Sequence, residues 1–417
     1  MVAEEEPVKY FKDELTPPDF LNKEYLENVL QKAENDKALK ITKLDIVPGS
    51  RAGDHFASVM FKAIVNYNSK GKTVDGRSLI IKTMPIEDGM KKELLKEMNV
   101  FGRETEMYTK VLPEMARIME SIGDTDEMGP RLVYHSTDPV VMIFDDITKY
   151  KYEMHTEFFD FDNVIKITKK LAKFHALSYY INDNKYTHKL NITEFESAFN
   201  ENFFERLKGM FDAFDQLQKE VLNWPGYEKL GEKLSTQKDT LQEKLLPAYK
   251  ANPEPGFNVL CHGDFHLRNM MFVMNGPNID KVMFLDYQMC YWGSPAMDLY
   301  YILYAISNND ARDRRGEILS IYHQTFCEYL QRLGCLKKPF SLLDLNIEIL
   351  KRGAMEVMWG ICGMPMMCMD LSKLDLESII NAGGAMVDMR QLMFKNETVV
   401  EAMKKILPDL LHKGLLD

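Results

Sequence analysis

Residues 260–286, LCHGDFHLRNMMFVMNGPNIDKVMFLD, decide how we expect the chain to fold. Apolar residues lead into a His-Gly-Asp tripeptide that ends at Asp264, and Asn269 follows five positions later. Two apolar runs come next, and Asp286 closes the stretch. The pairing of these two runs determines whether the three polar side chains meet.

The two apolar runs, 270–274 and 281–285, are separated by a turn that begins with Asn-Gly. This dipeptide between apolar runs indicates a β-hairpin, and we expect Pro277 to lengthen its turn beyond two residues. Antiparallel pairing places the start of the first run beside the end of the second. Two carboxylates and an amide therefore converge on one pocket, which suits oxygen-ligated Mg²⁺ and the orientation of a hydroxyl group.

The order of these residues is typical of kinases, which use a base Asp, an Asn five positions on and a metal-binding Asp after a hairpin. The plain alternative is a polar loop followed by a strand cap. Each residue alone favours that alternative, whereas the three in this order favour phosphoryl transfer. We predict that Asp264, Asn269 and Asp286 are catalytic, and that Asn269 and Asp286 are the metal ligands.

The composition is that of a globular protein large enough for two lobes. The chain has 417 residues, of which 45% are hydrophobic, and its formal net charge of −11 argues against nucleic acid or an anionic membrane as the main partner. Six cysteines without a CxxC pair indicate reduced thiols. Since neither a secretory segment nor a bilayer-spanning run is visible, we expect a cytoplasmic protein with no membrane span and no evident protein partner.

The first part of the chain is predicted to be a β-rich lobe that binds nucleotide phosphates. After a helix at 19–39, two β-rich runs flank a loop with Gly49 and Gly53. Backbone N–H groups of such a loop can close over phosphates. The loop lacks GxGxxG, however, and by itself it is an ordinary hairpin.

Lys82 ends the apolar strand SLIIKTMP, which is the setting of the kinase lysine that contacts nucleotide phosphates. The alternative is an edge-strand lysine that points to solvent. A helix at 90–112 follows, and Glu104 borders its buried face, with Glu97 as the second choice. A Lys82–Glu104 pair would position the lysine on the phosphates.

Two further strands, 131–135 and 140–144, lead to Phe144-Asp145-Asp146-Ile147, which leaves the sheet. In a kinase this segment is the hinge, whose backbone groups bind adenine. We therefore place the boundary between a nucleotide-binding lobe and a helical catalytic and substrate lobe near residue 148, with domains 1–148 and 149–417. The predicted fold class is α+β, a bilobal protein-kinase-like fold.

Helical periodicity dominates beyond the boundary. His175 lies in the first helix, 163–180, and we interpret it as a hydrogen-bonded core histidine. Further helices are expected at 195–222, 229–249, 296–306, 314–333, 341–358, 376–392 and 399–411.

Three departures from protein kinases point to a small acceptor. Gly263 replaces the arginine that reads a phosphorylated activation loop, and Asp286 is followed by Tyr-Gln rather than Phe-Gly. Asp298, which starts a buried-looking helix, lies only twelve residues after Asp286. This spacing leaves no room for a segment that docks a peptide.

The motifs HGDFHLRNMMF, FLDYQMCYWGSPAMDLYY, SLIIKTMP, FGRETEMY and LAKFHALSYY together resemble the insect ecdysteroid kinase-like family. This family is a branch of the choline/ethanolamine kinase and aminoglycoside phosphotransferase superfamily, and the resemblance runs from about residue 40 to about 390. It implies ATP, Mg²⁺ and phosphorylation of a hydroxyl group on a steroid or secondary metabolite, with Asp264 as the base. Residues 53–58 match the family's nucleotide loop, although Asp54, His55 and Phe56 differ from its usual pattern. The implied nucleotide-binding residues are Gly49, Gly53, Ser58, Lys82, Glu104, Phe144, Asp145 and Ile147.

The acceptor site is read from residues 355–369, MEVMWGICGMPMMCM, where methionines suit a flat apolar ligand. Methionine is equally this chain's general core filler, since 28 are spread throughout. A choline-type site would instead need an aromatic cage and acidic residues. A pseudokinase that binds a hydrophobic ligand is the third alternative. The predicted substrate residues are Trp292, Met355, Met358 and Trp359, and Tyr300 and Tyr301 are further candidates for a cage.

Overall fold

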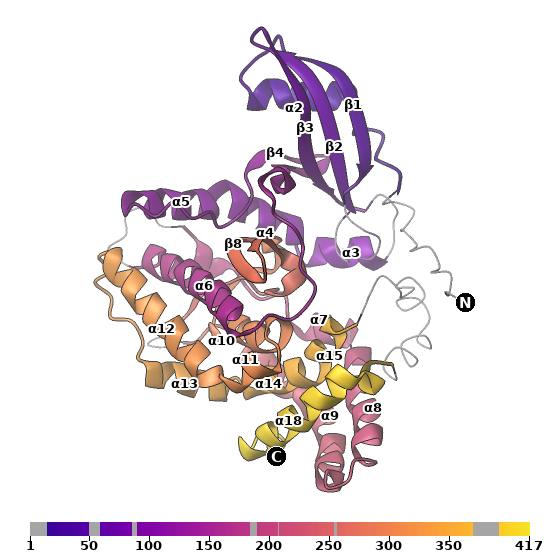
Figure 1. The fold of residues 1–417 in the computed structure, drawn as a ribbon, viewed down its shortest axis with the longest axis vertical. Coiled ribbons are helices and arrows are strands. Elements are labelled where there is room, and N and C mark those ends of the chain that lie inside the picture. The colour runs from indigo at the N-terminus through magenta and orange to yellow at the C-terminus, as the bar shows by residue number, and fades with distance from the viewer. Residues whose placement is uncertain are drawn as a thin grey trace.

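The computed structural model describes residues 15–49, 59–85, 90–183, 190–206, 208–253, 257–369 and 392–417. Figure 1 shows a small β-rich lobe at one end of the molecule and a larger, mainly helical lobe at the other. The predicted bilobal α+β, protein-kinase-like fold is confirmed. The last strand of the five-stranded sheet ends at Asp145, and the predicted lobe boundary near residue 148 falls in the turn η2 (Ile147–Tyr150) that follows.

The small lobe is an antiparallel sheet in the order β1-β2-β3-β5-β4. In β2 the residues Val59, Phe61, Ala63 and Val65 are buried, whereas the alternate residues are half-buried or exposed, so one face packs on the core. The elements are α2 (Lys23–Ala33), β1 (Lys40–Pro48), β2 (Val59–Ser69), β3 (Lys72–Thr83), α3 (Met90–Glu97), α4 (Val100–Glu106), η1 (Met107–Val111), α5 (Leu112–Ser121), β4 (Leu132–Thr137) and β5 (Val140–Asp145).

The helix expected at 90–112 is not continuous, so that prediction was wrong in its bounds. Asn99 adopts a left-handed conformation with φ of +49° and separates α3 from α4. Asn tolerates this conformation better than other side chains, because its short amide bonds locally. After this break, α4 continues through the π-helical turn η1 into α5, which ends at Ser121.

The hairpin of the central stretch forms as predicted, but its turn is shorter than expected. Strands β7 (Met270–Asn275) and β8 (Asn278–Phe284) pair Asn275 with Asn278, so only Gly276 and Pro277 lie between them. Gly276 has a φ of +59°, which glycine adopts without strain. Instead of a longer turn, the hairpin has a shift in strand register between Val273 and Met274.

The helices of the large lobe agree broadly with the periodicity, with two corrections. The helix expected at 195–222 is divided into α7, η4 and α8, and the one expected at 341–358 is divided at Arg352 into α13 and α14. The helix expected at 376–392 lies almost entirely outside the described residues. The short strands β6 and β9, which pair with each other, were not predicted. The elements are α6 (Phe161–Ile181), η3 (Ile192–Glu194), α7 (Glu201–Arg206), η4 (Lys208–Asp212), α8 (Ala213–Val221), α9 (Glu228–Ala248), β6 (Val259–Cys261), η5 (Leu267–Asn269), η6 (Tyr287–Met289), β9 (Tyr291–Gly293), α10 (Ala296–Tyr301), η7 (Ile302–Ile306), α11 (Asn309–Asp313), α12 (Arg315–Arg332), α13 (Leu342–Lys351), α14 (Gly353–Met358), η8 (Trp359–Gly363), α15 (Met364–Met367) and α18 (Glu397–His412).

All six cysteines are free thiols. In the ranges that the structure describes, no helix has both the length and the apolar character needed to cross a bilayer.

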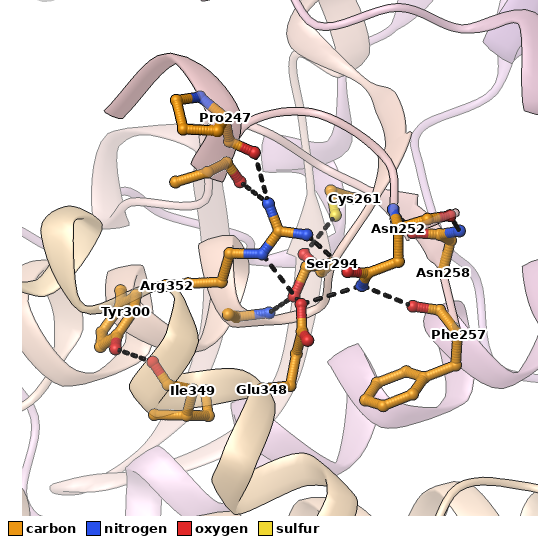
Figure 2. Close-up of polar contacts among 12 residues, drawn as sticks. Pro247, Asn252, Phe257, Asn258, Cys261, Ser294, Tyr300, Glu348, Ile349 and Arg352 are labelled. Atoms are coloured by element: carbon orange, nitrogen blue, oxygen red, sulfur yellow. Dashed lines mark hydrogen bonds and ion pairs between the residues drawn. The ribbon is translucent and has the colours of Figure 1, made fainter. Parts of the chain in front are cut away.

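A buried polar network near β6 joins α9 to α13 (Figure 2). The guanidinium of Arg352 donates to the carbonyls of Pro247 and Ala248 at 2.8 and 2.6 Å, to Asn252 Oδ1 at 2.8 Å and to Glu348 Oε1 at 2.9 Å. Pro247 and Ala248 end α9, so Arg352 binds carbonyls of the last turn, where a helix runs out of its own donors. The network therefore fixes the packing behind β6, which leads into Asp264.

Replacing Arg352 by Met is expected to lower the free energy of unfolding by roughly 3–5 kcal/mol, because Glu348 becomes a buried carboxylate without its cation. Urea titration measures the change. In the double variant with Glu348→Gln we expect at least about 1 kcal/mol to be recovered, because no buried charge is left unpaired. Equal destabilisation of the single and double variants would contradict this reading of the network.

Candidate active site

The hairpin brings the three polar residues of the central stretch together. Asn269 donates through Nδ2 to both the carbonyl and the Oδ2 atom of Asp264, each at 2.9 Å. The backbone N–H of Leu285, next to Asp286, donates to the carbonyl of Asn269 at 2.9 Å. Because the amide nitrogen of Asn269 is used by Asp264, its side-chain oxygen is the atom left to bind a cation.

Lys82 meets two carboxylates between the lobes. Its Nζ lies 2.6 Å from Glu104 Oε2 and 2.8 Å from Asp286 Oδ1, and the lysine side chain is buried. The structure thus pairs Lys82 with Glu104, the first choice from the sequence, and links the small lobe directly to Asp286. The pair is positioned by β3 and α4, which carry one residue each.

Burial and charge act against each other in this cluster. Burial favours the neutral amine of Lys82, but the carboxylates of Asp286 and Glu104 outweigh it and raise the lysine pKa. Burial raises the pKa of Glu104 to about 7, against the attraction of Lys82. One ammonium therefore lies between two carboxyl groups, and Asp286 is the more exposed of these, at 19% against 2% for Glu104, so it is the one open to a cation.

Asp264 is held as an ionised carboxylate. Its Oδ1 lies 3.1 Å from the hydroxyl of Tyr301 and 3.2 Å from Nε2 of His266. Burial raises the pKa of Asp264, but the attraction of His266 and His262 and the hydrogen bonds outweigh it and hold the pKa at about 2. At neutral pH the group can accept a hydrogen bond from an incoming hydroxyl.

Asp298, a buried acid in the first turn of α10, holds the loop that carries Asp264. Asp298 accepts hydrogen bonds from the backbone N–H groups of His262 at 2.6 Å and Gly263 at 3.0 Å. His175 Nε2 lies 3.0 Å from the same carboxylate, and its Nδ1 lies 2.8 Å from the hydroxyl of Tyr322. His175 is thus a hydrogen-bonded core histidine, as expected, and it also orients Asp298.

The backbone around Gly263 explains why this position is a glycine. Its φ is +82°, and a Cβ at this position would lie 2.2 Å from the carbonyl oxygen of Met289. Any side chain here would therefore displace either the loop of Asp264 or the turn after Asp286.

In the segment 144–147, which was predicted to be the hinge, the acidic residues bind groups of the five-stranded sheet. Asp145 lies 3.3 Å from a guanidinium nitrogen of Arg77 and 3.6 Å from one of Arg131, and its N–H donates to the Arg131 carbonyl at 3.1 Å. The N–H of Asp146 donates to the Ser78 carbonyl at 3.3 Å. These two amides are therefore occupied. Phe144 is buried in the core of the large lobe and Ile147 packs against the hairpin, so both line the junction of the lobes.

Asp146 is buried and holds the hinge through its carboxylate. It lies 2.8 Å from Lys62 Nζ and accepts from the hydroxyls of Ser78 and Thr148, each at 2.7 Å. Burial raises the pKa of Asp146, but Lys62 and the two hydroxyl groups outweigh it and hold the pKa at about 2.

Replacing Asp146 by Asn is expected to remove about 2 kcal/mol of unfolding free energy at pH 7. The pKa of Asp146 is lower in the folded than in the unfolded chain, so its stabilisation is present above pH 4 and is lost as the pH falls toward 2. The difference between wild type and variant should therefore shrink in urea titrations between pH 7 and pH 3. A difference that is constant with pH would contradict this assignment.

The remaining predicted nucleotide residues are placed only in part. Gly49 donates its N–H to the carbonyl of Met60 at 2.8 Å, and a Cβ there would lie 2.9 Å from backbone atoms of β2, so packing alone requires this glycine. Gly53 and Ser58 lie outside the described residues. The structure therefore gives no position for the phosphate loop itself.

The predicted substrate residues are mostly core residues. Met355 is fully buried, Met358 accepts a hydrogen bond from the hydroxyl of Tyr249 at 3.6 Å, and Trp292 belongs to β9. Trp359 differs, because the centre of its ring lies 3.9 Å from that of Tyr301, the residue that contacts Asp264, and its buried indole N–H has no hydrogen-bond partner among the described residues. Of the four, Trp359 is the one that the structure links to the carboxylate of Asp264.

The sequence did not predict how three residues serve the site, although Tyr301 was a candidate for an aromatic cage and Asp298 was expected to start a buried helix. Tyr301 and His266 contact Asp264 directly, and Asp298 holds its loop. Asp298 carried a usable signal, since an acid in the first turn of an otherwise apolar helix needs a buried donor. His266 and Tyr301 had no comparable signal, because a polar or aromatic residue at either position fits a core equally well.

The chain aligns over most of its length with solved phosphotransferase structures. A macrolide 2′-phosphotransferase from Brachybacterium faecium is 12% identical with a TM-score of 0.41, and the match covers 89% of this chain and 98% of that one. Choline kinase from Streptococcus pneumoniae is 13% identical with a TM-score of 0.34, and the match covers 90% and 99%.

No curated protein matches the sequence significantly. The model of the ecdysteroid kinase-like family, in contrast, matches residues 52–335, which is 284 of the 417 residues. The matched region contains Lys82, Glu104, Asp264, Asn269 and Asp286. The resemblance read from the motifs is thereby confirmed, and the chain belongs to the ecdysteroid kinase-like family of phosphotransferases.

Proposed function

We propose that the chain transfers the γ-phosphoryl group of ATP to a hydroxyl group of an ecdysteroid or a related uncharged metabolite, with Asp264 as the base. The observation that carries this proposal is the convergence of Lys82, Glu104 and Asp286 on one side and of Asp264 and Asn269 on the other. Membership of the family supports the same reaction class.

The donor set at the cleft fits a hard cation. Asp286 offers carboxylate oxygens and Asn269 an amide oxygen, which are the ligand types that Mg²⁺ prefers. These two residues would hold the ion, and Mg²⁺ would supply charge neutralisation on the nucleotide phosphates.

The chain's own groups would then position the reactants. Lys82 would stay bonded to Glu104, and it would exchange its hydrogen bond to Asp286 for hydrogen bonds to nucleotide phosphate oxygens. Asp264 would accept the hydrogen bond of the acceptor hydroxyl, orient its oxygen toward the γ-phosphorus and take the proton as the new bond forms. The hydrogen bonds from Tyr301 and Asn269 keep Asp264 in one orientation.

The charge distribution favours an uncharged acceptor over choline. A quaternary ammonium needs free carboxylates or an aromatic cage. Glu356 is fully buried and bound to Arg315, to Lys413 at 2.8 Å and to Tyr304 at 2.8 Å, so its charge is already compensated. Glu348 is likewise paired with Arg352. The two buried acids on α13 and α14 are therefore not available to an ammonium group.

A comparison of acceptors tests the proposed substrate class. The protein is incubated with ATP, Mg²⁺ and an equal concentration of 20-hydroxyecdysone, choline, ethanolamine or a phenolic glycoside, and the phosphorylated product is detected by mass. We expect the ecdysteroid or another uncharged hydroxyl compound to react with the highest kcat/KM. Reaction of an amino alcohol alone would contradict the proposal.

A thermal shift separates a kinase from a ligand-binding pseudokinase. Because Lys82, Asn269 and Asp286 are all in place, saturating ATP with Mg²⁺ is expected to raise Tm, and at 100 times Kd the stabilisation is about 2.7 kcal/mol. ADP with Mg²⁺ serves as a second ligand. An unchanged Tm with both nucleotides would favour the pseudokinase.

A further inference from the structure

Arg103, the neighbour of Glu104 on α4, reaches from the small lobe to the large one. Its Nη1 donates to the carbonyl of Cys290 at 2.7 Å and lies 3.4 Å from the carbonyl of Glu196. Its guanidinium lies 4.2 Å from the centre of the Phe195 ring. Cys290 comes directly after the turn η6, which follows Asp286.

Two other interactions join α4, and the turn η1 that continues it, to the turn η6. The backbone of Tyr287 acts on the carboxylate of Glu104 and works against the rise of its pKa, and the ring of Tyr108 meets that of Tyr287 edge-on at 5.7 Å. The receiving surface is itself cross-linked, because the N–H of Trp292 donates to the carbonyl of Phe195 at 2.7 Å. The helix that carries Glu104 is thus attached to a firmly held part of the large lobe.

We propose that Arg103 is a positioning residue, which holds α4 against the turn after Asp286 so that Glu104 keeps Lys82 in place for the nucleotide. This rests on the proposed function in one respect, namely that Lys82 contacts nucleotide phosphates. The latch consists of Arg103, Phe195 and the carbonyl of Cys290, all from this chain. Since Gly263 replaces the arginine that would read a phosphorylated loop, the latch keeps the helix in its working position without phosphorylation.

The contacts of Arg103 suit a residue that positions α4 rather than one that stabilises the whole fold. The two hydrogen-bond acceptors of Arg103 are carbonyl oxygens, so removal of the guanidinium leaves no unpaired carboxylate. Burial lowers the pKa of Arg103, as expected for a partly desolvated cation between two lobes. Arg103→Met keeps the apolar stem over Phe195 and removes only the donors and the charge.

The first test is hydrogen exchange in the absence of nucleotide, followed by mass spectrometry of peptides that cover 97–111 and 285–292. Arg103→Met is expected to speed exchange in both peptides by at least about fivefold, because the local opening that the latch prevents becomes easier. The matched control is Arg117→Met, whose guanidinium lies 2.8 Å from Glu114 on the exposed side of α5. Unchanged exchange in Arg103→Met would overturn the proposal.

The second test is a double-mutant cycle with Glu104→Gln, with the Kd of ATP–Mg²⁺ from titration calorimetry as the readout. Arg103→Met is expected to weaken binding about tenfold in the wild-type background and less than about twofold in the Glu104→Gln background, because it acts through Glu104. Equal losses in both backgrounds would show an independent, merely structural role and would overturn the proposal.

The two tests separate this proposal from the proposed function. If the wild type bound no ATP–Mg²⁺, the proposed function would fail, while the exchange experiment would still decide whether Arg103 holds the helix. If Arg103→Met does not fold, Arg103→Lys is used, which retains the charge but loses the second donor arm. We expect Arg103→Lys to speed exchange in both peptides to a smaller extent and to weaken the binding of ATP–Mg²⁺. Faster exchange with no effect on the Kd of ATP–Mg²⁺ would contradict the latch.

Discussion

Asp286→Asn is expected to lower kcat by about 10³-fold, because the variant loses the negative charge that would hold the cation on the phosphates. The carboxylate now bonds Lys82 at 2.8 Å through one oxygen and Gln288 at 3.2 Å through the other. An amide can accept only one of these bonds without placing its NH₂ group against a donor. We therefore also expect weaker binding of ATP–Mg²⁺ and a higher requirement for Mg²⁺.

The fold should tolerate this substitution. Asp286 has a φ of +59°, a left-handed conformation that Asn adopts as readily as Asp. Lys82 retains Glu104 as its partner at 2.6 Å. The matched control is Asp280→Asn, an exposed acid of the same hairpin, which should leave kcat, Kd and Tm unchanged. Near-normal turnover of Asp286→Asn would remove the metal role of this residue.

Asp264→Asn is expected to lower kcat by about 10³-fold while leaving the Kd of ATP–Mg²⁺ within about twofold, because the residue acts on the acceptor hydroxyl. In the folded protein Asp264 accepts hydrogen bonds from Asn269 and Tyr301. The variant keeps one amide oxygen for these donors but has no charged oxygen for the incoming hydroxyl. Steady-state kinetics and nucleotide titration on the same preparation measure both effects.

The contrast between the two variants is informative. Asp286→Asn should affect nucleotide binding and turnover together, whereas Asp264→Asn should affect turnover alone. A variant of Asp264 that turns over normally would mean that the proton leaves by another route. Loss of nucleotide binding in that variant would mean that Asp264 lies on the nucleotide side of the cleft.

The sequence predicted the parts of the fold that depend on local pattern. The Asn-Gly hairpin, the strand that ends at Lys82 and the stripe that points Glu104 inward follow from periods of two and of 3.6 residues. The same stripe left Glu97 as the second choice, and the structure pairs Lys82 with Glu104. The break at Asn99 and the two-residue turn at Gly276 escaped prediction, since each depends on a local positive φ.

The groups that hold the site depend on contacts between distant segments. Asp298 binds backbone N–H groups 35 and 36 positions earlier, and Arg103 binds a carbonyl 187 positions later. No local pattern specifies such a partner. The acceptor residues were the least predictable, because a methionine or tryptophan that lines a site has the same pattern as one in the core, as Met355 illustrates.

The most direct test of the account follows the γ-phosphoryl group itself. ATP labelled in its γ-phosphate is mixed with Mg²⁺, 20-hydroxyecdysone and an excess of enzyme over nucleotide, and the label is followed in a single turnover for the wild type, Asp264→Asn and Asp280→Asn. The account predicts that label appears on a hydroxyl oxygen of the ecdysteroid with the wild type and Asp280→Asn, and about 10³-fold more slowly with Asp264→Asn. Label that stays on ATP, or that moves equally fast with Asp264→Asn, would contradict it.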